Sequence, residues 1–83
     1  GAAQEVDIVG FIKEFRAVCP QIEFDKIMID NITDEGLEAV SRNFRDTKML
    51  TIQQNTRLTN EGLKALEGFE ELSYLNFSYN YQI

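Results

Sequence analysis

The sequence predicts a small α/β fold in which three short parallel strands alternate with helices in a stack. Three observations lead to this prediction. A nine-residue segment occurs twice, a pattern of alternating apolar residues recurs in step with it, and a helical segment precedes both. Strands that alternate with helices at a regular period are typical of repeat architectures, in which each unit packs on its neighbours.

The duplicated segment is the strongest signal in the chain. Residues 32–40, ITDEGLEAV, align with residues 58–66, LTNEGLKAL, at an offset of 26 residues, and five of the nine positions are identical. Thr33 and Thr59 lie where helix N-caps belong, and the acidic residues that follow them favour the positive end of a helix dipole. We therefore expect a helix to begin in each copy.

Apolar residues and glycines follow both predicted helix starts. The apolar residues fall at helical spacing, which predicts one buried stripe on each helix: Leu37, Val40 and Phe44, then Leu63, Leu66 and Phe69. Gly36 and Gly62 occupy equivalent positions in the first turn, where glycine lowers helix stability by about 1 kcal/mol. Their repetition predicts close packing on a neighbouring unit. Gly68 is predicted to end the second helix in a left-handed cap.

Short runs of alternating apolar residues predict three strands, each with one buried face. Residues 49–55, MLTIQQN, match residues 74–80, YLNFSYN, and residues 27–29 form an earlier partial copy. The side chains predicted to be buried against the helices are Ile27, Ile29, Leu50, Ile52, Leu75 and Phe77.

A further helix, over about residues 4–19, is predicted ahead of the repeats. Its apolar residues form one stripe: Ile8, Phe11, Ile12, Phe15, and Val18 or Cys19. We expect this helix to cap the open end of the first unit. The chain is thus predicted to be one domain over residues 1–83, with repeat units over 22–45, 47–69 and 70–83, the last incomplete.

The strand pattern LxxLxLxxN, followed by a helix and repeated about every 20–29 residues, is the leucine-rich-repeat signature. Residues 72–80 carry it almost in full, and residues 47–55 carry it with Thr47 in the first apolar position. The chain therefore resembles a leucine-rich-repeat protein over about residues 24–80. Its helix starts resemble those of ribonuclease-inhibitor-like and F-box-type repeats. The resemblance implies a short solenoid with its helices on one side and a strand face that holds a partner protein.

The chain departs from the family pattern in two places. The first unit is three residues shorter between strand and helix, so Asn31 stands one place early for the family asparagine. F-box-type repeats usually carry cysteine where Asn55 and Asn80 stand, so the subfamily stays open. An asparagine side chain at this position can bond backbone groups where the chain leaves a strand.

The residues between the buried strand positions are predicted to form an exposed face with three rungs. Methionine and aromatic side chains on it favour a protein interface, although an ordinary solvated surface is the alternative. The predicted protein-binding residues are Lys26, Met28, Asp30, Met49, Thr51, Gln53, Tyr74, Asn76, Ser78, Tyr79 and Tyr81.

The C-terminal end suggests a second hypothesis. The last predicted strand has no cap, and an open strand edge with apolar side chains invites pairing. The alternative function is therefore a structural or assembly subunit that self-associates, or docks into a larger complex, through this strand. A piece cut from a longer repeat protein would also end in this way.

Few residues suggest catalysis or metal binding. The chain has no histidine, and Cys19, its only cysteine, has no identifiable base partner, so we expect a structural thiol. Residues 30–36 carry oxygen ligands but break the calcium-loop pattern at Ile32. We therefore expect a non-enzymatic protein without cofactor or metal.

The charge balance is acidic, with 14 Asp and Glu against 8 Lys and Arg. The basic residues form no cluster, which disfavours nucleic acid and anionic membranes as partners. A single cysteine favours a reducing compartment, and no apolar stretch approaches the ~20 residues that span a bilayer. The expected partner is another protein, and the expected location is cytoplasmic or another reducing compartment.

Overall fold

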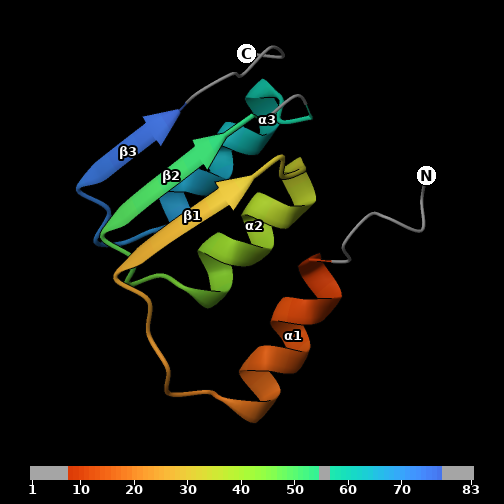
Figure 1. Cartoon of the computed structure of the whole chain (residues 1–83), viewed down its shortest axis with the longest axis vertical. Helices are drawn as coiled ribbons and strands as arrows, with labels where there is room; N and C mark the ends of the chain where they lie inside the picture. The colour runs from red at the N-terminus through yellow and green to blue at the C-terminus, as the bar shows by residue number, and fades with distance from the viewer. Residues whose placement is uncertain (1–7, 55–56, 78–83) are drawn as a thin grey trace.

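Helices and strands alternate along the chain in the computed structural model, which describes residues 8–54 and 57–77 (Figure 1). The elements in chain order are α1 (Ile8–Val18), β1 (Lys26–Asp30), α2 (Asp34–Asn43), β2 (Met49–Gln53), α3 (Asn60–Leu63), the 3-10 helix η2 (Lys64–Gly68) and β3 (Tyr74–Phe77). The structure is therefore mixed α/β, as predicted.

The three strands form one parallel sheet in the order β1-β2-β3. Their register is one-to-one, so that Lys26 lies opposite Met49, and Met49 lies opposite Tyr74. Helices α2 and α3 lie on one side of the sheet, and α1 packs beside α2 on the side away from α3 (Figure 1). The strands are parallel because each connection between them contains a helix. The helix returns the chain to the end of the sheet at which the previous strand began.

The core lies between the sheet and the helices. Leu50 and Ile52 from the central strand are fully buried there. The stripe predicted on α2, Leu37, Val40 and Phe44, is also buried. The first residues of the duplicated segment, Ile32 and Leu58, complete this core.

Both predicted threonine caps are confirmed. The Thr33 hydroxyl oxygen accepts a hydrogen bond from the Gly36 N–H at 3.1 Å. The Thr59 hydroxyl oxygen accepts one from the Glu61 N–H at 3.2 Å. The side chains thus satisfy backbone donors that a helix start leaves without an intrahelical partner.

The second helix differs from the prediction, because only one turn of α-helix forms before η2 begins at Lys64. A 3-10 helix rises more per residue than an α-helix. Nine residues in α3 and η2 therefore span about 16 Å, close to the ~15 Å of the ten-residue α2. The mixed helix keeps the two helices matched in length.

The prediction of a left-handed Gly68 is wrong, since no described glycine has a positive φ. A Cβ at Gly68 would lie 2.8 Å from Ser41 Oγ, so this glycine permits close approach of η2 to α2. The left-handed residues are Asn31 and Gln54, with φ of 57° and 51°, each directly after a strand. Asn55 and Asn80 lie outside the described residues.

Two side chains predicted to be buried are exposed. Leu75 is 40% exposed, because β3 is an edge strand and no described residue packs beyond it. Phe11 is 59% exposed. Of the two residues predicted for the end of the α1 stripe, Val18 is 79% exposed and Cys19 is half-buried. The single stripe predicted on α1 therefore does not face the core along its whole width, and only Ile12 of this helix is fully buried.

Arg16 ties α1 to α2 and to the connection that leads to β1. Its Nε and Nη2 donate to the Asn43 carbonyl at the end of α2, at 2.9 and 2.6 Å. Its Nη1 donates to the carbonyls of Cys19 and Ile22 in the connection to β1. The guanidinium carbon also lies 4.6 Å from the ring centroid of Phe44. One side chain thus joins α1, the connection and α2.

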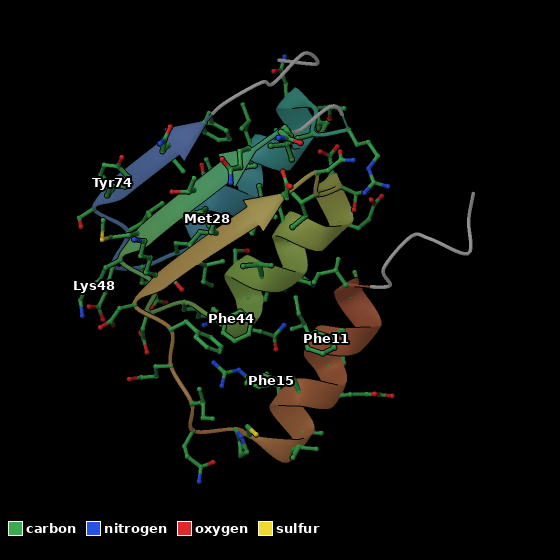
Figure 2. The ribbon with its side chains drawn as sticks, viewed as in Figure 1. Phe11, Phe15, Met28, Phe44, Lys48 and Tyr74 are labelled. Carbon is green, nitrogen blue, oxygen red and sulfur yellow. The ribbon has the colours of Figure 1, made fainter. Side chains whose placement is uncertain are left out.

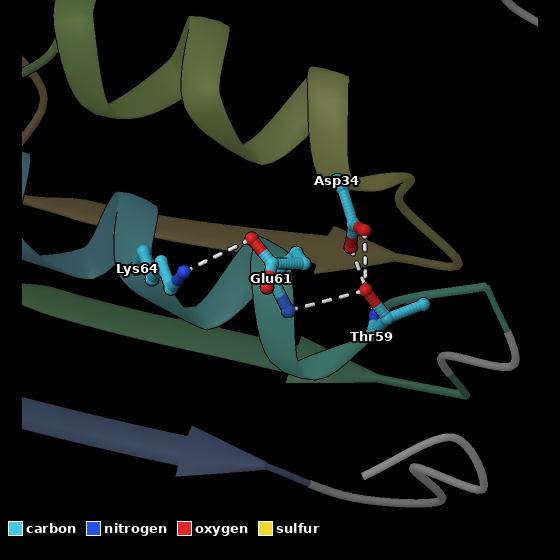
Figure 3. Close-up of polar contacts among 4 residues, drawn as sticks. All are labelled: Asp34, Thr59, Glu61 and Lys64. Carbon is cyan, nitrogen blue, oxygen red and sulfur yellow. Dashed lines mark hydrogen bonds and ion pairs between the residues drawn. The ribbon is translucent and has the colours of Figure 1, made fainter.

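Asp34 joins the two copies of the duplicated segment, residues 32–40 and 58–66 (Figure 3). Its Oδ1 accepts from the Thr59 N–H at 2.8 Å, and its Oδ2 accepts from the Thr59 hydroxyl at 2.5 Å. A Cβ at Gly62 would lie 2.1 Å from Asp34 Oδ1, and one at Gly36 would lie 2.8 Å from Ile8 Cγ2. The close packing predicted at both glycines is therefore confirmed.

We predict that Asp34→Ala lowers the free energy of unfolding by about 1–3 kcal/mol, because hydrogen bonds to a charged acceptor are lost at the junction. Urea denaturation measures the change. Glu35→Ala is the matched control, because Glu35 is exposed and also contributes negative charge to the first turn of α2. Equal losses in the two variants would contradict the role given to Asp34.

The Thr47 side chain is fully buried, and its hydroxyl has no hydrogen-bond partner among the described residues. Threonine occupies here the first apolar position of the strand pattern. A buried polar atom without a partner lowers the stability of the folded state.

We predict that Thr47→Val raises the free energy of unfolding by about 1 kcal/mol, because valine has a similar shape without the hydroxyl. The midpoint of urea denaturation should increase with an unchanged slope. Thr51→Val on the partly exposed strand position is the control. A less stable Thr47→Val protein would show that the hydroxyl does have a stabilising partner.

Candidate protein-binding site

The candidate site is the sheet face opposite the helices, which we call the strand face. Side chains alternate between the two faces of a strand. Because Leu50 and Ile52 point into the core, Met49, Thr51 and Gln53 point away from it. The same alternation on β1 and β3 assigns the remaining residues of the strand face: Lys26, Met28, Asp30, Tyr74 and Asn76.

The register brings these residues together as the predicted rungs. Met28 lies opposite Thr51, and Thr51 lies opposite Asn76. Asp30 lies opposite Gln53. Ser78, Tyr79 and Tyr81, which were also predicted to bind a partner, lie outside the described residues.

Apolar side chains are exposed on this face. Met28 is 62% exposed and Tyr74 is 48% exposed (Figure 2). Met49, on the strand between them, is also exposed. Met49 lies directly opposite Tyr74, with Met28 as its diagonal neighbour on β1. Lys26 and Asp30 place one charge of each sign at the two ends of β1. The face thus combines adaptable apolar side chains with charged groups at its border.

Four acidic residues lie in the segments that lead into the strands: Glu23, Asp25, Asp46 and Glu71. A side-chain hydrogen bond with Asp46 raises the pKa of Glu23 above its ordinary value, and the negative charges of Asp46, Asp25 and Glu71 act in the same direction. A hydrogen bond between two carboxyl groups requires a proton on one of them. The Lys48 ammonium lies 3.6 Å from Asp25 Oδ1 and balances part of this charge.

The structure also contains an apolar groove that was not predicted, between α1 and β1. Its volume is about 370 Å³. Phe11 and Phe15 line it from α1, Phe24 lines it from the connection, and Ile27 and Ile29 line it from β1 (Figure 2). The aromatic residue in the connection, Phe24, was the signal in the sequence that could have indicated it.

Cys19 is half-buried. Among the described residues, no three His, Cys, Asp or Glu side chains lie close enough together to hold a metal ion. None of the helices in residues 8–54 and 57–77 has both the length and the apolar character needed to cross a bilayer.

Comparison of the chain with protein-family models, with curated proteins and with solved structures finds no match.

We predict that Glu23→Gln becomes more stable relative to the wild type as the pH rises from about 4 to about 7. The raised pKa means that the folded wild-type protein binds the proton more tightly than the unfolded chain does. The stability that this proton contributes is present at low pH and is lost as the pH rises through the folded-state pKa. Glutamine at position 23 is neutral throughout this range, so the variant does not lose stability in this way as the pH rises.

Thermal or urea unfolding of both proteins across this pH range measures the difference. Glu67→Gln removes an exposed charge from η2 and is the matched control. A difference between wild type and Glu23→Gln that stays constant with pH would contradict the interaction between Glu23 and Asp46.

Proposed function

We propose that the chain is a protein-interaction module of leucine-rich-repeat type that holds a partner protein on its strand face. The observation that carries the proposal is the exposure of Met28, Met49 and Tyr74 on one face of an in-register sheet. Monomeric proteins bury most side chains of this size, and grouped exposed apolar residues often mark interaction sites.

The composition of the strand face supports protein rather than small-molecule recognition. The face is an open sheet, whereas small ligands usually bind in concave pockets. Methionine adapts its shape to a partner surface, and tyrosine combines a large apolar ring with a hydroxyl donor. Around them, Lys26, Asp30 and Asn76 provide the polar border that interfaces typically have.

The repeat arrangement supports the same proposal. Helices α2 and α3 pack on the side of the sheet opposite the strand face, so the core side chains do not contribute to that face. Substitutions on the face therefore affect binding with little effect on packing. Such a separation suits a non-enzymatic binding module, which we propose to act in the cytoplasm or another reducing compartment.

We predict that Met28→Ala, Thr51→Arg and Tyr74→Ala combined reduce the affinity for a strand-face partner by at least about 100-fold, because two apolar anchors are lost and a charge is introduced between them. Partners captured from the source cells by the wild-type chain are purified and titrated by calorimetry. The circular dichroism spectrum should remain that of the wild type.

A matched control places the same kinds of change on the helix side: Glu35→Ala, Lys64→Ala and Glu38→Arg, all at exposed positions. This control should bind the partner with unchanged affinity. If the strand-face triple variant binds as well as the wild type, the partner surface lies elsewhere and the proposal is wrong.

A further inference from the structure

We propose that the two ends of the sheet associate head-to-tail, with β3 of one copy of this chain adding beside β1 of a second copy, over the apolar groove. This inference concerns the sheet edges and goes beyond the proposed binding of a partner on the strand face. The proposed partner of the edge strand β3 is a second copy of the same chain.

The proposed contact continues the strand pairing inside the sheet. The step from β1 to β2 and the step from β2 to β3 use the same parallel, one-to-one register. The entries to the strands are also equivalent, since Met49 N donates to Asp25 O at 2.9 Å and Tyr74 N donates to Lys48 O at 3.1 Å. A third step of the same kind places β1 of a second copy beside β3.

Among residues 8–54 and 57–77, no strand pairs with the outer edge of β1 or of β3. An edge strand presents backbone donors and acceptors that another strand can pair with. The two edges therefore have matching polarity and hydrogen-bonding capacity.

Apolar side chains at the two ends of the sheet fit together. Continued register places Leu75 of the first copy beside Ile27 of the second, and Phe77 beside Ile29. Leu75 is 40% exposed on the helix side of β3, and Phe77 is half-buried there. The groove between α1 and β1, with the exposed ring of Phe11 at its wall, lies on the same side of β1. The exposed apolar side chains of β3 would therefore be covered by the apolar groove beside β1 of the second copy.

Charge is compatible with this pairing. β3 contains no ionisable carboxylate or basic side chain in Tyr74–Phe77, so no like charges meet across the new strand pair. Lys26, the charged residue of the groove wall, lies opposite Tyr74 in the continued register. An ammonium group near a tyrosine ring is favourable.

Head-to-tail pairing also covers both exposed ends, whereas a symmetric β1-to-β1 pair would leave Leu75 exposed. A heterologous contact of this kind does not close on itself after two copies, and longer assemblies can form. The weight-average mass of the wild-type chain should therefore rise with concentration in sedimentation equilibrium, between micromolar and millimolar protein.

Two charged variants test the contact by complementation. Phe11→Glu disables the groove end and Leu75→Glu disables the β3 end, and we expect each alone to weaken association by at least about tenfold. An equimolar mixture should form dimers, because each variant retains the end that the other lost. Since a misfolded variant could not restore dimers, the mixture also controls for folding.

Two further variants separate this contact from other surfaces. Val18→Glu lies on α1 outside the groove and should associate as the wild type does. Thr51→Arg lies at the centre of the strand face and should also self-associate, although we expect it to impair partner binding. Failure of strand-face binding and failure of self-association are therefore distinguished.

Register is tested by disulfide trapping in a Cys19→Ser background. Met28→Cys and Asn76→Cys are made in separate chains, because continued register places these positions opposite one another. Adjacent strands lie about 4.8 Å apart, within the Cα–Cα range that disulfides accept. Mild oxidation of the mixture with diamide should give the mixed dimer in preference to either homodimer.

Three results would overturn the inference. The first is a constant monomer mass up to millimolar concentration. The second is a mixture of Phe11→Glu and Leu75→Glu that remains monomeric while the wild type associates. The third is preferential trapping of a homodimer through Cys at position 28 or 76, which would indicate a symmetric contact.

Discussion

The in-register pairing of three parallel strands is the constraint on which the rest of the structure depends. A slip of one residue would exchange the two faces of a strand, because side chains alternate. Leu50 would then point to solvent and Thr51 into the core. The paired backbone bonds at each strand entry oppose such a slip, since Lys48 N and Met49 N both donate to Asp25 O. Core, strand face and open edges all follow from this register.

The units are joined by polar contacts as well as by the sheet. Arg16 connects the first helix to the end of α2 through the Asn43 carbonyl, and Asp34 connects the start of α2 to Thr59. The two contacts lie at opposite ends of α2. This helix is therefore fixed at both ends, and Gly62 lacks the Cβ that would block the second contact.

The duplicated segment made much of this fold predictable. Its threonines cap helices and its glycines pack closely, because both properties depend on residues near in sequence or repeated in it. The 3-10 helix was not predictable, since the pattern of Leu63 and Leu66 suits either helix. The prediction for Gly68 was wrong, because glycine suits either a left-handed turn or the close approach of two elements. Only the position of Ser41 in the folded structure distinguishes the two.

The candidate site was predictable to the same degree. Alternation along β2 indicated which residues share the strand face, and the structure aligns them as expected. The groove and the exposure of Phe11 depend on how α1 is placed. That placement rests on the packing of Ile12 and Phe15 against the core and on bonds between Arg16 and backbone carbonyls up to 27 residues away. Such backbone acceptors cannot be recognised in an amino-acid pattern.

The attachment of α1 has a consequence for the order in which parts of the molecule open. α1 contributes one fully buried side chain, Ile12, whereas β2 and α2 contribute most of the core. Local opening requires least free energy where the fewest apolar contacts are lost. Amide hydrogens of α1 should therefore exchange with solvent through detachment of that helix while the sheet stays closed. The groove between α1 and β1 then persists only while α1 stays attached through Ile12, Phe15 and Arg16.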